Sequence, residues 1–227
     1  MSIIQINDLT KTYHDTEIPV HAVNGIDLSF EQGEFAAIVG PSGCGKTTLM
    51  NMIGGLEQPT SGKVIVDGSV MSELSSHNLI DFRLRNIGFV FQAYNLIPVL
   101  TAKENVEFIM QLQNWDKKEM DKRTISLLQS VGLGDKLNSK PNQLSGGQQQ
   151  RVAVARALAS KPKFILADEP TANLDSIATN QLLDIMENLN KEEQITFIFA
   201  THDQRVMDKA RRVVTLDDGK VISDIRK

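Results

Sequence analysis

Three short elements follow one another in this chain of 227 residues, and together they restrict its fold more than any other feature. The first, residues 40–47, reads GPSGCGKT and matches the G-x-x-x-x-G-K-[ST] pattern of phosphate-binding loops. The second, residues 144–148, reads LSGGQ, and the third is an apolar run that ends at Asp168 and Glu169. Because chance matches each required residue type only roughly one time in twenty, the ordered set is not accidental.

Apolar runs of strand length alternate with helical patterns, which is typical of an α/β fold with a mostly parallel sheet. The predicted strands are residues 35–39, 87–91, 164–167 and 196–200, and residues 46–53 are predicted to form the helix after the glycine-rich loop. Residues 213–216 and 221–222 flank an Asp-Asp-Gly-Lys turn and predict a hairpin. Alternating apolar residues predict antiparallel strands at one edge; they are Ile4, Ile6, Ile26, Leu28 and Phe30.

The pattern becomes helical between Gln92 and Pro162. A helix is predicted from about residue 145 to 160, and a second helical face is assigned to Val106, Ile109, Met110 and Leu112. We therefore expect a single domain over residues 1–227. Its core comprises residues 1–92 and 162–227, and a helical subdomain of about residues 93–161 is inserted in it.

Composition and charge exclude several classes of protein. The net charge of −4 gives no reason to expect nucleic acid as a partner. The first residues lack the basic and apolar regions of a signal peptide, and no stretch approaches the roughly 20 apolar residues that cross a bilayer. A single cysteine excludes an internal disulfide and fits a reducing cytosol. We expect a soluble chain whose membrane role, if any, comes through a partner.

The glycine-rich loop predicts a nucleotide phosphate site, because glycines let backbone N–H groups approach phosphate oxygens at a helix N-terminus. Lys46 is expected to reach the β- and γ-phosphates, and the Thr47 hydroxyl is expected to ligate Mg²⁺. For Cys44, a small filler at a variable position is favoured over a redox switch. The residues expected to bind nucleotide here are Gly40, Pro41, Ser42, Gly43, Cys44, Gly45, Lys46, Thr47 and Thr48.

The carboxylate pair lies at the carboxyl end of a predicted buried strand, where open α/β sheets bind their ligands. Asp168 fits a Mg²⁺ carboxylate, either as a direct ligand or through a water. Glu169 is the candidate that polarises the attacking water. A weaker alternative is that the two acids cap a helix before Pro170.

These motifs resemble the ATP-binding cassette (ABC) family over essentially the whole chain. The resemblance implies an ATPase with a P-loop NTPase (RecA-like) core, an antiparallel β edge and an inserted helical subdomain. It also implies a homodimer that sandwiches two ATP molecules. A second anion site would then close over the nucleotide of the other subunit, formed by Ser145, Gly146, Gly147 and Gln148.

The resemblance also assigns roles to single residues. Glu169 matches the general base, His202 the switch histidine that contacts the γ-phosphate, and Gln92 the glutamine that touches Mg²⁺ and water. The implied Mg²⁺ ligands are Thr47, Gln92 and Asp168. Tyr13 resembles the aromatic residue that stacks on adenine, and Asp175 belongs to a loop along the dimer interface. A lone histidine at a strand end is usually structural, and Tyr13 read alone could be an ordinary surface tyrosine.

Residues 89–101, 51–56 and 148–153 resemble one branch in particular, the ATPases of lipoprotein-releasing, macrolide-efflux and antimicrobial-peptide transporters together with a cell-division ATPase. That likeness implies a cytoplasmic subunit on the inner face of the membrane, which drives a separately encoded permease and exports or extracts a lipoprotein, peptide or drug. A regulatory cell-division ATPase and a soluble ABC ATPase without a transporter remain alternatives. The transported substrate is not specified by this chain.

Overall fold

The structure is a computed structural model that describes residues 2–14 and 19–227. The chain forms two compact units, which are described separately below. Unit 1 comprises Met1–Arg83 and Thr196–Lys227, and unit 2 comprises Leu84–Ile195. The predicted helical subdomain falls within the residues of unit 2, and its boundaries remain a proposal.

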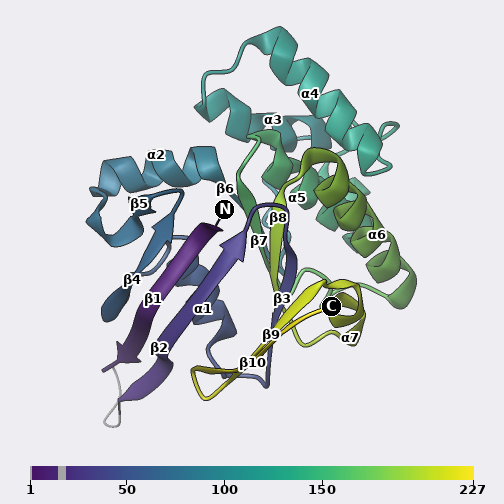
Figure 1. Cartoon of the computed structure of the whole chain (residues 1–227). Helices are drawn as coiled ribbons and strands as arrows, with labels where there is room; N and C mark the ends of the chain where they lie inside the picture. The colour runs from purple at the N-terminus through teal and green to yellow at the C-terminus, as the bar shows by residue number, and fades with distance from the viewer. Residues whose placement is uncertain (1, 15–18) are drawn as a thin grey trace. The chain divides into compact units, whose positions relative to one another are not determined.

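The first sheet of unit 1 is antiparallel and has the strand order β2-β1-β4-β5 (Figure 1). Its strands are β1 (Ser2–Tyr13), β2 (Val20–Glu31), β4 (Ser61–Val66) and β5 (Ser69–Val70). Ile6 pairs with Leu28 on one side and with Val64 on the other, and these apolar side chains are buried. The antiparallel edge predicted from the alternating residues is therefore confirmed.

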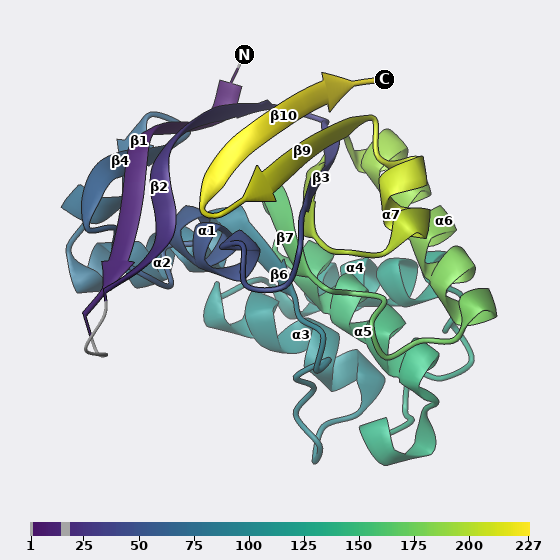
Figure 2. The ribbon, with the colours of Figure 1, turned by 90° about the horizontal axis from the view of Figure 1, so that it is seen from below.

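The second group of strands in unit 1 contains β3 (Phe35–Val39), β8 (Thr196–Ala200), β9 (Arg212–Asp217) and β10 (Lys220–Arg226). β3 pairs in parallel with β8 and β9, and β10 returns antiparallel to β9. Figure 2 shows this hairpin in yellow beside β3. Every residue of β3 and β8 is buried, as expected for strands covered on both faces.

The helices of unit 1 are α1 (Lys46–Ile53), the 3₁₀ turn η1 (Met71–Glu73) and α7 (Gln204–Lys209), and α2 (Ser76–Asn86) begins there. The sequence-based bounds of the helix after the loop agree with α1. The rings of Phe35, Phe197 and Phe199 contact one another in the core. Phe197 and Phe199 are stacked, and Phe35 is tilted against both, with its centroid 4.8 Å from that of Phe199.

Unit 2 contains the parallel strands β6 (Ile87–Val90) and β7 (Phe164–Asp168) and four further helices with a 3₁₀ turn. The helices are α3 (Ala102–Leu112), α4 (Lys117–Ser130), η2 (Pro141–Gln143), α5 (Gly146–Ala159) and α6 (Ser176–Glu193). α5 packs on β6, α3, α4 and α6, and Gly88 is required because a Cβ there would lie 2.6 Å from the Ala157 carbonyl oxygen. This mixed architecture confirms the predicted α/β fold. Within the described residues, no helix combines the length and the apolar character needed to span a membrane.

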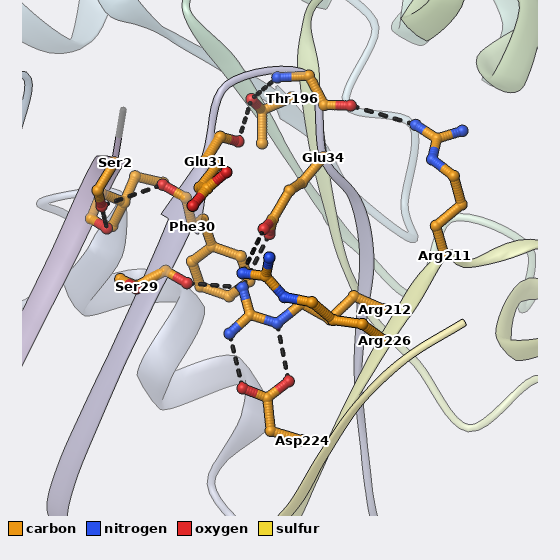
Figure 3. A network of polar contacts seen from close by, with 12 residues as sticks. Ser2, Ser29, Phe30, Glu31, Glu34, Thr196, Arg211, Arg212, Asp224 and Arg226 are labelled. Carbon is orange, nitrogen blue, oxygen red and sulfur yellow. Dashed lines mark hydrogen bonds and ion pairs between the residues drawn. The ribbon is translucent and has the colours of Figure 1, made fainter.

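A buried arginine joins three parts of unit 1 that lie far apart in sequence (Figure 3). Arg212 on β9 donates two hydrogen bonds to the Asp224 carboxylate, at 2.8 and 2.7 Å, and one to Glu34 at 2.8 Å. It also donates to the Ser29 carbonyl at 2.6 Å, and its guanidinium lies over the Phe30 ring. The side chain of Arg212 is 6% exposed, so these contacts fully compensate a desolvated charge.

Replacing Arg212 with glutamine is expected to destabilise the fold by on the order of 3 kcal/mol, because it leaves Glu34 and Asp224 without their buried partner. The matched control is Arg226→Gln, which removes the other partner of Glu34. The Arg226 side chain is 58% exposed, and an exposed pair contributes about 1 kcal/mol or less. The urea midpoint of each variant measures the difference, and equal shifts would contradict this assignment.

The same network makes stability depend on acid pH. The hydrogen bonds from Arg212 hold the pKa of Asp224 below its ordinary value, although partial burial opposes them. A carboxyl whose pKa is lower in the folded chain stabilises the fold above the unfolded pKa, and this contribution is lost as pH falls through the folded pKa. Asp224→Asn should therefore reduce the difference in urea midpoint between pH 7 and pH values below about 3.9.

Candidate nucleotide-binding site

The glycine-rich loop of unit 1 joins β3 to α1, as its sequence predicts. Gly40 and Gly45 have φ angles of 149° and 101°, a region that favours glycine. A Cβ on Gly40 would overlap the carbonyl oxygen of Leu216, and one on Gly45 would overlap that of Ala22. The backbone therefore approaches its neighbours so closely that only glycine fits at these two positions.

Lys46 is buried and folds back over the loop that precedes it. Its Nζ donates to the carbonyl oxygens of Gly40 and Pro41, at 2.8 and 2.9 Å, and lies 3.8 Å from Cys44 Sγ. Cys44 is 4% exposed, and its Sγ would lie 2.7 Å from a Cβ on Gly40. The loop thus encloses the Lys46 ammonium group, and the small Cys44 side chain packs beside it.

The N-terminus of α1 carries the features of an anion site. Gly45 is its N-cap and supplies no side-chain hydrogen bond to the first turn. An α-helix leaves its first N–H groups without intrahelical partners, and they point toward a ligand with the positive end of the helix dipole. Ser42, Gly43 and Thr47 are exposed here, and Thr48 is half-buried.

Tyr13 lies at the end of β1 and is tied to two side chains of unit 1. Its hydroxyl donates to Glu57 Oε1 at 2.6 Å, and Lys11 Nζ lies 5.0 Å from the ring centroid. Partial burial and the hydrogen bond to Glu57 raise the pKa of the Tyr13 phenol. Lys11 also pairs with Glu57 at 3.0 Å, so the three side chains hold one another in place, and the adenine contact of Tyr13 stays a prediction.

His202 is exposed two residues after the end of β8. The chain on either side of it is fixed, because the Thr201 N–H donates to the Ile38 carbonyl at 3.1 Å and Asp203 caps α7. This position follows the carboxyl end of a strand that pairs in parallel with β3, the strand that leads into the loop. The γ-phosphate contact that the resemblance assigned to His202 stays a prediction.

In unit 2, Asp168 ends β7 and Glu169 follows it with a φ angle of 45°. A left-handed backbone at a glutamate is strained by on the order of 1–3 kcal/mol, and such strain concentrates at functional sites. The alternative in which the two acids cap a helix does not hold. The next helix, α6, begins at Ser176 and is capped by Asp175, whose carboxylate accepts from the Ala178 N–H at 2.8 Å.

Residues 145–148 form the N-terminus of α5 and cap it reciprocally. Ser145 Oγ accepts from the Gln148 N–H at 3.3 Å, and Gln148 Oε1 accepts from the Ser145 N–H at 2.9 Å. Gly146 and Gly147 occupy the first two helical positions, whose N–H groups have no intrahelical partner. A Cβ on Gly146 would lie 2.7 Å from Tyr94 Oη, so a side chain there would have to displace the Tyr94 hydroxyl.

The segment around Gln92 is held by backbone contacts within unit 2. Gln92 is exposed two residues after the end of β6, and its carbonyl accepts from Asn173 Nδ2 at 3.0 Å. Gln150 is fully buried in α5 and donates to the Phe91 carbonyl at 3.3 Å and to the Pro170 carbonyl at 2.9 Å. These contacts connect α5 to the residue before Gln92 and to the residue after Glu169.

Three residues without a predicted role contribute to this segment and its contacts with α5: Tyr94, Gln150 and Arg156. The sequence could have indicated a structural role for Gln150. It lies on the apolar face of α5 that also carries Leu158, and a buried polar side chain there needs a hydrogen-bond partner. No comparable signal exists for Arg156, whose partners are backbone carbonyls 61 and 62 residues away.

The predicted Mg²⁺ ligands are Thr47 in unit 1 and Gln92 and Asp168 in unit 2. Across residues 2–14 and 19–227, no group of three His, Cys, Asp or Glu side chains forms a metal cluster. A hydroxyl, an amide and one carboxylate are all oxygen donors, which suits an ion that keeps waters and phosphate oxygens in its shell.

Comparisons with known proteins agree with these features. The family described as "ABC transporter" matches residues 23–172. The ABC transporter ATP-binding protein MJ1508 of Methanocaldococcus jannaschii is 47% identical over 225 residues, covering 99% of this chain and 100% of that protein. The macrolide export ATP-binding/permease protein MacB of Hyphomonas neptunium is 46% identical over 222 residues. That match covers 98% of this chain, which spans only 34% of MacB's length.

Solved structures give the same result. The dimeric post-hydrolysis state of the ATP-binding cassette MJ0796, bound to ADP and Pi, matches with a TM-score of 0.89 and 42% identity, and 98% of each chain is covered. Another dimeric structure of MJ0796 matches with a TM-score of 0.90. The family model and the solved structures agree. The chain therefore belongs to the ABC transporter family, as one of its ATP-hydrolysing cassettes.

Proposed function

We propose that two copies of this chain close over two ATP molecules and drive a separate membrane permease of the export type. The observation that carries this proposal is that one chain holds two helix N-termini suited to phosphate, at α1 and at α5. The first follows a loop with its own lysine. The second is exposed at Ser145 and begins with two glycines, as a surface that meets a nucleotide from outside requires.

Nucleotide binding begins at Lys46. Its ammonium group exchanges the carbonyl oxygens of Gly40 and Pro41 for the β- and γ-phosphate oxygens, which carry more negative charge. The glycines at 40, 43 and 45 let the backbone N–H groups surround the same phosphates. The Tyr13 ring, held by Glu57, stacks on the adenine.

Hydrolysis uses residues that follow three strands. Glu169 accepts the proton of the attacking water, and its φ angle of 45° places it in a strained turn directly after β7. His202 contacts the γ-phosphate, and Gln92 orients the water. Thr47, Gln92 and Asp168 would hold Mg²⁺, which when bound neutralises charge on the phosphate oxygens.

The second phosphate site acts in trans. The N–H groups of Gly146 and Gly147 and the Ser145 hydroxyl bind the γ-phosphate held by the partner's loop, so that ATP bridges two chains. Ser145 exchanges its cap contact with the Gln148 N–H for the phosphate, and the helix dipole favours the anion. Hydrolysis removes the bridging charge and shifts the population back to the open state.

The names of the relatives support a membrane partner and an export role. MacB is named as a macrolide export protein that combines an ATP-binding part with a permease, and MJ1508 is named as an ABC transporter ATP-binding protein. The proposal places the cassette on the cytoplasmic face of the membrane beside its permease, with a lipoprotein, a peptide or a drug as the cargo.

This proposal predicts that the cassette needs a membrane protein for full activity. A membrane protein that co-purifies with the chain from its host is identified, the two are coexpressed, and the purified complex is reconstituted in lipid vesicles. ATP hydrolysis per cassette should rise several-fold over that of the cassette alone, and Glu169→Gln should still bind the membrane protein without hydrolysis. ATP-dependent dimers that neither bind nor respond to the membrane protein would favour a non-transport role instead.

A further inference from the structure

The backbone turn after Gln92 is strained at two successive residues. Tyr94 and Asn95 have φ angles of 34° and 50°, in the left-handed region that residues with a Cβ seldom adopt. The Asn95 N–H donates to the Ala93 carbonyl and tightens the turn. Two consecutive residues in this conformation persist only where surrounding contacts hold them.

Arg156 of α5 supplies those contacts. Its Nη1 donates to the Asn95 carbonyl at 2.5 Å and its Nη2 to the Tyr94 carbonyl at 2.9 Å. Burial lowers the pKa of this arginine, and within residues 2–14 and 19–227 its guanidinium forms no ion pair with a carboxylate. The half-buried guanidinium is bound to two carbonyl oxygens of the turn, and displacement of either oxygen breaks one of these charge-assisted hydrogen bonds.

The same turn touches the other end of α5. Tyr94 Oη lies against Gly146, 2.7 Å from where a Cβ would be, at the first helical residue after Ser145. One residue therefore contacts both the phosphate-binding N-terminus of α5, by its side chain, and the last turn of α5, through Arg156. The turn begins two residues after Gln92, so both ends of α5 contact the segment that follows Gln92.

We propose that Arg156 is a positioning residue that holds the left-handed turn at Tyr94 and Asn95, and thereby couples α5 to Gln92. Arg156 itself does not contact nucleotide. The inference rests on the proposed function, in which Gln92 and the N-terminus of α5 act on ATP. Arg156 then affects the rate of hydrolysis and the closure of the dimer, and it leaves the affinity of the loop in unit 1 for ATP unchanged.

The test is a rescue experiment on the full chain. Arg156→Gln should lower kcat at least tenfold and keep ATP affinity, measured with a fluorescent nucleotide, within about threefold, because the phosphate contacts are unchanged. Adding Asn95→Gly should restore much of the rate, since glycine adopts a positive φ without strain. Asn95 is exposed. The decisive comparison is between two factors: the change in kcat that Asn95→Gly causes in the Arg156→Gln chain, and the change that it causes in the wild type.

Arg151→Gln is the matched control. Arg151 lies on the same helix and donates to a backbone carbonyl, that of Val131, at 3.3 Å. Its loss should change kcat by less than about threefold, and Asn95→Gly should not act differently in its background. If Arg156→Gln fails to fold, Arg156→Lys takes its place, because lysine can donate to one of the two carbonyl oxygens. Asn95→Gly should then raise kcat by a smaller factor.

A folded, ATP-binding Arg156 variant that glycine at position 95 does not rescue would overturn the proposal, and so would wild-type kcat in Arg156→Gln. Failure of the proposed function has a different signature, in which the Glu169→Gln chain shows no ATP-dependent association and the wild-type chain shows no response to a membrane protein.

Discussion

Replacing Glu169 with glutamine is expected to slow ATP hydrolysis by roughly 10²–10⁴-fold, about 3–5 kcal/mol in the barrier, while ATP binding is kept. Glutamine has nearly the shape of glutamate, so the strained turn at φ 45° can be retained while the proton acceptor is lost. Because ATP persists, the two chains should remain closed. Phosphate release measures the rate, and size-exclusion chromatography with ATP measures the dimer.

The matched control for this change is Glu192→Gln, which removes an exposed acid of α6 and should leave both measurements unchanged. Hydrolysis by Glu169→Gln at a rate near that of the wild type would show that another group takes the proton. Loss of ATP binding in Glu169→Gln would instead mean that the carboxylate belongs to the ground-state binding site.

Replacing Lys46 with alanine is expected to weaken ATP binding by at least about 100-fold. Hydrogen bonds to a charged group contribute about 1.5–3 kcal/mol each, and Nζ makes two in this structure that phosphate oxygens would replace. Lys63→Ala, at an exposed position of β4, is the control and should bind as the wild type does. Micromolar affinity retained by Lys46→Ala in a titration would refute the assignment of the loop.

Mixing Lys46→Ala with Ser145→Arg separates the in-trans arrangement from a self-contained site. The Lys46→Ala chain keeps its α5 N-terminus, and the Ser145→Arg chain keeps its loop. Together they form at most one complete composite site, so the readout is association rather than turnover. With Glu169→Gln in both chains, ATP should produce heterodimers that neither variant forms alone.

Two outcomes of this mixing experiment contradict the arrangement. Association of the mixture no better than that of either variant alone would mean that the two sites do not share a nucleotide. Loss of ATP binding in Ser145→Arg by itself would place the N-terminus of α5 in the pocket of its own chain.

Much of the local structure follows from sequence, because it depends on neighbours along the chain. The bounds of β3, β8 and α1 agree with the prediction, since continuous apolar runs and a glycine-rich turn are local signals. Two helix caps also have local sequence patterns, although they were not predicted. Ser145 and Gln148 have the spacing of a capping box, and Asp175 is three residues before the N–H that it caps.

One helical face was assigned wrongly. Val106 and Met110 are buried, but Leu112 is 53% exposed. At about 100° per residue, position 112 lies well away from position 106 around the helix, so its apolar character did not reflect burial.

Other features depend on residues that are distant in sequence, and only the tertiary structure decides them. Tyr13 meets Glu57 across 44 positions, Arg212 meets Glu34 across 178, and Arg156 meets the Tyr94 carbonyl across 62. Charge and polarity along the chain do not identify such partners, because many residues could satisfy each group and packing selects one. The sequence by itself thus determined the family, the phosphate-binding loop and the carboxylate pair, since these are contiguous motifs. Only the tertiary structure decided which side chains hold these motifs in place, because buried charges and amides need hydrogen-bond partners that folding brings near them.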